Sequence, residues 1–188
     1  MKIKQFVMAY SANHSSIKAL LNDKFESLRP VLRINVEVIT DDLENSYIRI
    51  ELNTPVAANG KRGWLNLKVW ESPTTEIIYN ILDNDSIKKA RDTENKVKGS
   101  TSVFSTDFLT IEYKSTGVVG GCPAENDNDG CFYLEGDKIT FINSEKIDAF
   151  KEYSNCTFEW KKPIMTAMQI PTEKILGAYL VEFDRVKN

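Results

Sequence analysis

The sequence predicts a mainly β fold, a barrel or a sandwich with one or two short helices. Many short runs alternate apolar with polar residues, which is the two-residue period of a strand. Glycine, asparagine and aspartate stand between these runs, as they do in the turns of antiparallel sheets. Together these two observations favour a chain built from many short, sequentially connected strands.

The expected strands follow one another with few helical segments between them. They cover residues 4–10, 31–38, 47–52, 64–70, 101–104, 108–113, 117–120, 132–134, 138–142, 156–160 and 177–183. No repeat, heptad pattern or low-complexity linker interrupts this series. We therefore expect residues 1–188 to form a single domain.

The clearest strand is the segment 31–38. Its side chains divide into an apolar face and a polar face, with Leu32, Ile34, Val36 and Val38 on the first and Arg33, Asn35 and Glu37 on the second. The segment 47–52 repeats this alternation and adds Arg49 and Glu51 to a polar face.

Two short helices are expected. Residues 11–16 are rich in side chains that cap helices, and Ile17, Leu20, Leu21 and Phe25 then fall on one helical face. A second short helix is expected at residues 86–91, with Asp85 or Ser86 as its cap.

The charged residues of the two polar strand faces allow two interpretations. On a sheet with one solvated face, Arg33, Glu37, Arg49 and Glu51 would be ordinary cross-strand charge pairs, which is the interpretation we favour. In a barrel whose polar face points inward, the same residues would form a buried charged cluster.

Composition excludes several classes of protein. The chain is 41% apolar and 27% charged, and its net charge of −3 is spread along the sequence without a basic stripe, so no nucleic-acid partner is expected. No apolar run approaches the roughly 20 residues that span a bilayer, and the start lacks a secretory segment. We expect a cytoplasmic protein with no membrane partner.

Metal and cofactor sites are not expected either. Cys122, Cys131 and Cys156 show no C-x-x-C spacing, and the chain has one histidine. Reduced thiols are the favoured state, and a bridge between Cys122 and Cys131 is the alternative. Residues 125–136 resemble part of a calcium loop, but the twelfth position is Gly136 rather than glutamate.

Two further residue types are ambiguous in sequence. His14 precedes a helix in a polar segment, which favours a surface or capping position over general-base catalysis. Trp64, Trp70 and Trp160 all lie on expected strands, where a core position and a cavity wall have the same sequence pattern.

The first half of the chain resembles the acetoacetate decarboxylases and their relatives. The resemblance rests on the segments 10–13, 17–21, 25–26 and 31–37, and on the Asn-Gly turn of 59–65. It implies a closed or partly closed antiparallel β-barrel with one or two short helices.

The resemblance also implies an active site. Counted without a gap from the Asn-Gly turn, the family's catalytic lysine and its neighbour fall on Lys88 and Lys89, and Glu51 falls close to the family's active-site glutamate. Lys88 would attack a keto acid to form a Schiff base, Lys89 would lower the pKa of Lys88, and Glu51 would move a proton or orient the substrate. The family's arginine near the N-terminus has no counterpart here, where only Lys2 and Lys4 are basic.

Three functions follow from these residues. The first is a decarboxylase-like lyase that acts on a small carbonyl compound through Lys88 and needs no cofactor. The second is a noncatalytic barrel that binds a small carbonyl or acidic ligand and has lost the chemistry. The third is a homo-oligomeric protein with no small ligand.

Overall fold

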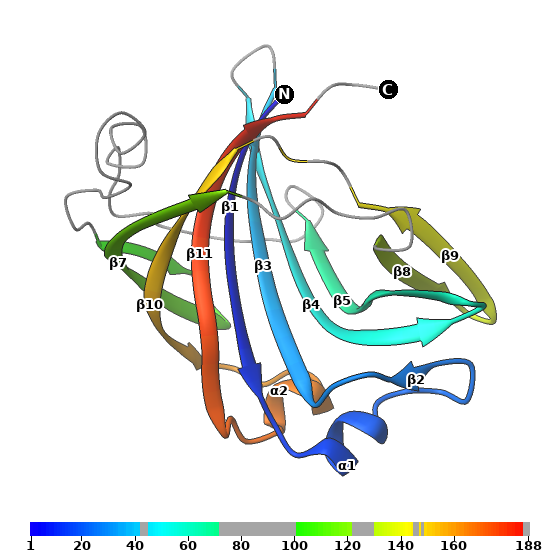
Figure 1. Cartoon of the computed structure of the whole chain (residues 1–188). Helices are drawn as coiled ribbons and strands as arrows, with labels where there is room; N and C mark the ends of the chain where they lie inside the picture. Colours follow the sequence, from blue (N-terminus) through cyan, green and yellow to red (C-terminus); the bar gives the residue numbers. More distant parts are fainter. Residues whose placement is uncertain (42–44, 72–100, 122–129, 145–146, 148, 186–188) are drawn as a thin grey trace.

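The fold is known from a computed structural model, which describes residues 1–41, 45–71, 101–121, 130–144, 147 and 149–185 (Figure 1). The expected helix at 86–91 lies outside these residues. So do Lys88, Lys89, Cys122 and residues 125–129 of the segment that resembles part of a calcium loop.

The described residues form one large sheet. Its strands are β1 (Lys2–Ser11), β2 (Glu26–Ser27), β3 (Val31–Thr40), β4 (Ser46–Ala58), β5 (Lys61–Glu71), β6 (Thr101–Ser105), β7 (Leu109–Gly121), β8 (Gly130–Glu135), β9 (Lys138–Asn143), β10 (Phe150–Trp160) and β11 (Lys174–Asp184). The strand order is β6-β7-β10-β11-β1-β3-β4-β5-β8-β9, and β2 pairs with β4. The prediction of a mainly β fold is confirmed.

Of the closed or partly closed barrel that the resemblance implied, the sheet forms a version that is not closed. Every strand pair is antiparallel except β5 with β8. In the described part of the chain, no pairing joins β6 to β9, so the strongly curved sheet of Figure 1 stays open between these two strands.

Both helices are short. α1 spans His14–Lys18, and α2 spans Thr166–Gln169. Asn13 caps α1 because its side-chain oxygen accepts a hydrogen bond from the backbone N–H of Ser16 at 3.2 Å. His14 is exposed at the first helical position, which agrees with the expected surface position.

The apolar spacing of residues 17–25 predicted a longer helix than the one observed. After Lys18 the chain turns, and the backbone N–H of Phe25 bonds to the carbonyl of Asn22. The side chain of Asn22 accepts a hydrogen bond from the N–H of Lys24, and such local bonds compete with helix continuation. α2 carries no comparable sequence signal, and sequence reasoning missed it.

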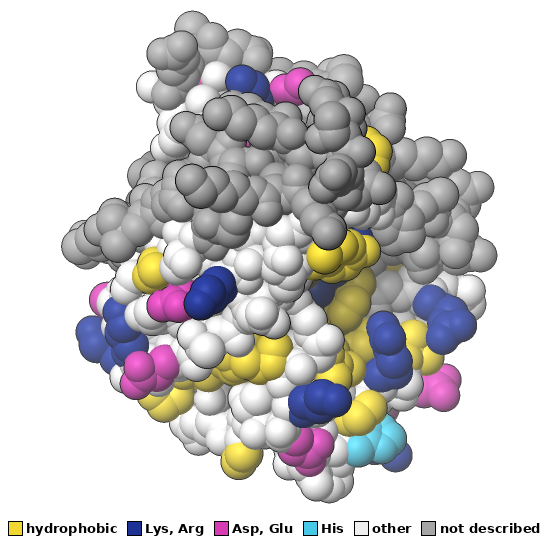
Figure 2. Space-filling view, turned by 60° about the vertical axis from the view of Figure 1, so that its left-hand side comes forward, with side chains coloured by type: hydrophobic (Ala, Val, Ile, Leu, Met, Phe, Trp, Pro, Cys, Tyr) yellow, Lys and Arg dark blue, Asp and Glu magenta, His cyan; other side chains and the backbone are white. Residues whose placement is uncertain are grey.

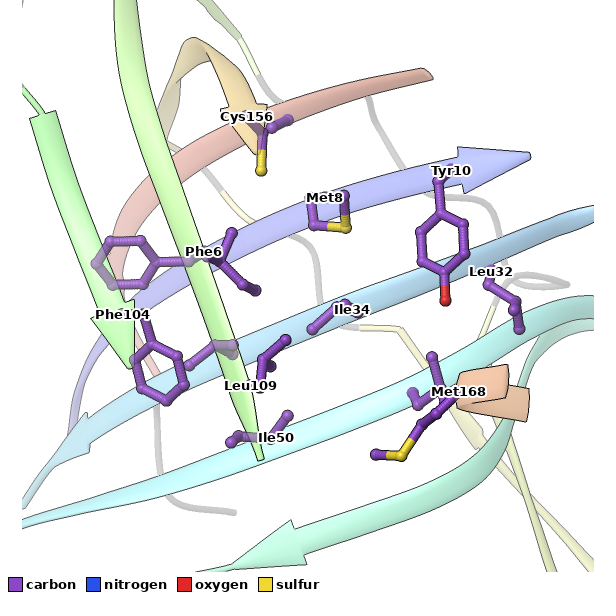
Figure 3. Close-up of a cluster of buried hydrophobic side chains, with 14 of the residues drawn as sticks. Phe6, Met8, Tyr10, Leu32, Ile34, Ile50, Phe104, Leu109, Cys156 and Met168 are labelled. Atoms are coloured by element: carbon purple, nitrogen blue, oxygen red, sulfur yellow. The ribbon is translucent and has the colours of Figure 1, made fainter. Parts of the chain in front are cut away.

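One face of the sheet is a dry core. Phe6, Met8 and Tyr10 of β1 pack there with apolar side chains of β3 and β4, which include Leu32, Ile34, Ile50 and Leu52. β6, β7 and α2 cover this face, and Figure 3 shows Phe104, Leu109 and Met168 pointing at it. We call this surface of the sheet the core face.

The strand pairing brings side chains of the opposite face into rows that cross several strands. In one row, Lys151 of β10 pairs with Val181, which pairs with Gln5, then Glu37 and Arg49. The adjacent row runs from Tyr179 through Val7 and Asn35 to Glu51. We call this opposite surface the polar face.

Candidate binding cavity

A cavity of about 820 Å³ lies against the polar face. The long strands β1, β3, β4 and β11 form its floor, and residues of β5, β8 and β9 form much of its remaining wall. Its volume lies in the range of small-molecule pockets, roughly 300–1,000 Å³. The two ends of the curved sheet therefore cover opposite faces: β6 and β7 cover the core face, and β8 and β9 border the cavity.

Two glycines allow β8 to lie close to both of its neighbours, β5 and β9, beside this cavity. A Cβ atom on Gly63 would collide with the backbone oxygen of Gly130, and one on Gly130 would collide with the backbone oxygen of Ile142. All three residues line the cavity. Larger residues at these two glycines would push β8 away from β5 and β9 and distort this part of the cavity wall.

Glu51 is buried in the floor of the cavity and is 5% exposed. One carboxylate oxygen accepts a hydrogen bond from Arg49 Nε at 2.9 Å, and Arg49 Nη2 lies at the same distance from this oxygen. The other oxygen accepts a hydrogen bond from Asn35 Nδ2 at 3.1 Å. Glu51 is thus a carboxylate held in place in the cavity floor by two neighbouring side chains.

Arg49 links Glu51 to two other side chains. Its Nη1 lies 3.0 Å from a carboxylate oxygen of Glu71, and its Nη2 donates to the hydroxyl of Tyr133 at 2.6 Å. Burial alone would lower the pKa of Arg49, but the negative charge of Glu51 and its neighbours raises the pKa above its ordinary value. Arg49 is therefore a permanent cation whose charge is neutralised within the wall.

Glu37 is the second buried carboxylate, at 6% exposed. It accepts a hydrogen bond from Gln5 Nε2 at 3.1 Å and two from Arg185, at 3.3 and 3.4 Å. The interpretation that we favoured from sequence, charge pairs on a solvated face, is wrong for these carboxylates. β5, β8 and β9 cover the face, so the alternative of a buried charged cluster holds.

Arg33 lies at another part of the cavity and has a different environment. Its guanidinium carbon lies 3.8 Å from the ring centre of Trp64, and its Nε donates to Asn53 Oδ1 at 2.8 Å.

The three tryptophans occupy different positions. Trp64 lines the cavity, and Trp70 stacks on Phe108 in the core. Trp160 donates a hydrogen bond to the Tyr10 hydroxyl at 3.4 Å.

Cys131 is a free cysteine in the cavity wall, and Cys156 is a free cysteine buried at the core face. Burial raises the pKa of Cys131 to about 11 and that of Cys156 to about 12. Both are therefore protonated thiols at neutral pH rather than nucleophiles. Among the described residues, no group of three or more His, Cys, Asp or Glu side chains is placed to hold a metal ion.

The predicted site residues are thus placed only in part. Glu51 lies in the cavity, whereas Lys88 and Lys89 lie outside the described residues. Sequence reasoning missed Asn35, Tyr133 and Lys151 as cavity residues. Asn35 could have been found as the polar residue between Arg33 and Glu37 on the same strand face, but Tyr133 and Lys151 reach the cavity only through long-range pairing.

Comparison with solved structures identifies the architecture. The crystal structure of acetoacetate decarboxylase from Legionella pneumophila aligns with 97% of this chain and 81% of its own, with a TM-score of 0.64 and 11% sequence identity. The fold is that of the acetoacetate decarboxylases. The expectation that the resemblance set for the fold is confirmed.

Two related enzymes share this acetoacetate-decarboxylase-like fold. An acetoacetate decarboxylase-like enzyme from Sphingomonas wittichii covers 97% of this chain and 87% of its own, with a TM-score of 0.62 and 7% identity. The enduracididine biosynthesis enzyme MppR gives a TM-score of 0.68 at 6% identity, with coverages of 97% and 82%. At such identities the likeness concerns the fold alone.

Sequence comparisons add nothing to this assignment. No protein-family model matches the chain, and no curated protein matches it.

No helix in the described part of the chain has the length and apolar character needed to cross a bilayer.

Proposed function

We propose that this protein binds a small keto acid in the cavity of the polar face and acts on it as a decarboxylase-like lyase through Lys88. The observation that supports this best is the buried Glu51, held by Arg49 and Asn35 in the floor of an 820 Å³ cavity. Buried charges are costly unless they are paired, and they gather at functional sites. One MppR structure of the same fold is complexed with pyruvate, a small keto acid.

The proposed chemistry begins at Lys88. Its neutral amine attacks the ketone carbon, water leaves, and a protonated imine forms. In a β-keto acid such as acetoacetate, the carboxylate then departs as carbon dioxide, and the electrons of the broken C–C bond move to the imine nitrogen to form an enamine. The enamine carbon takes a proton, and hydrolysis of the resulting imine releases the ketone and restores Lys88. Lys89 would favour the neutral amine of Lys88 by charge repulsion, and Glu51 would orient the substrate.

Borohydride trapping tests this proposal. The protein is incubated with acetoacetate or pyruvate, treated with borohydride and digested, and the peptides are analysed by mass spectrometry. We expect a reduced secondary amine at Lys88, retained in Lys89→Gln and absent in Lys88→Gln. An unmodified Lys88 under these conditions would contradict the Schiff-base step.

A noncatalytic binding protein is the second candidate, and the contacts of Glu51 favour it. Both oxygens of Glu51 already accept hydrogen bonds from Arg49 or Asn35, which leaves this carboxylate poorly suited to remove a proton. In this case the keto acid would bind and be protected from solvent without loss of carbon dioxide. Calorimetric binding without carbon dioxide release or an adduct would distinguish this candidate from the first.

A further inference from the structure

The charge of the cavity differs from the charge of the chain. The chain as a whole has a net charge of −3, and the surface in Figure 2 shows acidic and basic side chains interspersed. Among its described residues, the cavity is lined by six cations, Arg29, Arg33, Arg49, Arg62, Lys151 and Arg185, and by two carboxylates, Glu37 and Glu51. The excess of positive charge favours an anionic ligand.

Not all of these cations are available to a ligand. Arg49 is bound to Glu51 and Glu71, and Arg185 is bound to Glu37. Arg29 and Arg62 are exposed at the rim of the cavity. Arg33 and Lys151 remain as partly buried cations in the wall that form no ion pair with a described carboxylate.

Arg33 is held in a fixed orientation without being neutralised. The ring of Trp64 covers one side of the guanidinium, and Nε is occupied by Asn53. The terminal nitrogens have no hydrogen-bond partner among the described residues. A fixed guanidinium with free terminal nitrogens is suited to bind a carboxylate through two parallel hydrogen bonds.

Lys151 provides a second anchor on a different strand. Its ammonium lies 4.8 Å from the ring centre of Tyr179 and 5.3 Å from that of Tyr153. These aromatic faces hold the cation without supplying a counter-charge. Lys151 shares a row with Gln5, whereas Arg33 pairs with Ala9 on the same strand β1, so the two cations stand at separate places on the cavity wall.

We infer that the cavity takes a dicarboxylic keto acid, with one carboxylate at Arg33 and the other at Lys151. This inference rests on the proposed function, in which the cavity is the ligand site, and it names the class of ligand. A ligand with one carboxylate would leave one of the two cations without a counter-charge. A ligand with two carboxylates neutralises both, and it leaves the keto group between them over the floor that contains Glu51.

Calorimetric titration with unreactive probes tests this inference. Glutarate and adipate are compared with pentanoate and hexanoate, which match them in chain length but lack one carboxylate. We expect at least tenfold tighter binding of one of the diacids than of its monoacid. Equal affinities, or no binding of any of the four, would overturn the inference.

Variants assign the two carboxylates. Arg33→Gln and Lys151→Gln should each reduce the diacid-to-monoacid affinity ratio to about one, and Arg33→Lys should retain part of it. Lys114→Gln, at an exposed position of β7 away from the cavity, is the matched control and should keep the full ratio. If Arg33→Gln and Lys151→Gln both fold and both keep the diacid-to-monoacid affinity ratio of the unchanged protein, the inference is also overturned.

The trapping experiment separates this inference from the proposed function. A borohydride adduct at Lys88 together with equal diacid and monoacid affinities would support the Schiff-base chemistry and contradict the dicarboxylate assignment. A diacid preference that depends on Arg33 and Lys151, without an adduct at Lys88, would support the ligand class and contradict the Schiff-base chemistry.

Discussion

The two faces of this sheet are built from alternate residues of the same strands but have opposite chemistry. On β3, Leu32, Ile34 and Val36 enter a dry core, while Arg33, Asn35 and Glu37 line a cavity. The core face gains stability from apolar burial, which contributes about 25 cal/mol per Å². The polar face buries charges that contribute little net stability. The core face therefore maintains the fold, whereas the polar face forms the cavity that we propose as the ligand site.

The largest effect is expected at the core face. Phe6→Ala removes a fully buried ring that packs against Tyr113 with centroids 5.5 Å apart. Loss of buried apolar surface together with the cavity left behind should lower the free energy of unfolding by about 3–5 kcal/mol. Urea denaturation measures this change, and a loss below about 1 kcal/mol would mean that this face is not the main core.

A smaller effect is expected when the charges of the polar face are altered. Glu51→Gln removes the buried carboxylate that is paired with Arg49. This change should lower the free energy of unfolding by about 1–3 kcal/mol, because an unpaired polar group then stays buried at the cavity. The double change of Glu51→Leu with Arg49→Met should recover most of this loss, since an apolar pair can replace a buried ion pair.

The double variant should also lose keto-acid binding in calorimetric titration. Recovered stability with lost binding would sharpen the contrast between the two faces. A double variant less stable than Glu51→Gln would contradict it, since the charges would then maintain the fold.

Thiol reactivity provides a third comparison of the faces. Burial raises the pKa of Cys131 to about 11, so its thiol stays protonated up to that pH. Because the thiolate is the reactive form, alkylation of Cys131 by iodoacetamide at pH 8 should be about 100-fold slower than alkylation of an unfolded cysteine. Peptide mass spectrometry over a pH series measures the rate, with the protein in urea as control. Bound ligand should protect Cys131 and leave Cys156 unchanged, whereas equal protection of both thiols would contradict the separation of the faces.

The same raised pKa values determine how stability depends on pH. The folded chain retains the protons of Cys131 and Cys156 above pH 9, where the unfolded chain releases them. Their contribution to stability is therefore complete below pH 9 and is lost as the pH rises through about 11 for Cys131 and about 12 for Cys156.

The smallest effect is expected at a partly exposed ion pair that belongs to neither the core nor the charge cluster. Lys4 and Glu182 lie 3.6 Å apart across β1 and β11. Glu182→Gln should change the free energy of unfolding by less than about 1 kcal/mol, because solvent screens the pair. Thermal unfolding measures the change, and a cost as large as that of Glu51→Gln would remove the distinction between buried and partly exposed charges.

The sequence could predict the strands but only part of the site. The alternation of residues 31–38 is a local signal, and the structure confirms both of its faces. Whether Glu37 and Glu51 are solvated depends on where β8 and β9 lie, and no local pattern contains that information. For the same reason Lys151, more than a hundred residues from Glu37, could not be assigned to the same cavity from sequence.

The three tryptophans allow the most direct test of the central claim, which is that the polar face binds the ligand. Indole ¹H–¹⁵N resonances, assigned with Trp64→Phe, can be followed by NMR during titration with pyruvate and with a diacid. We predict a saturable shift of Trp64, which lies under Arg33, and no shift of Trp70 or Trp160. An unmoved Trp64, or a larger shift of Trp70 in the core, would contradict it.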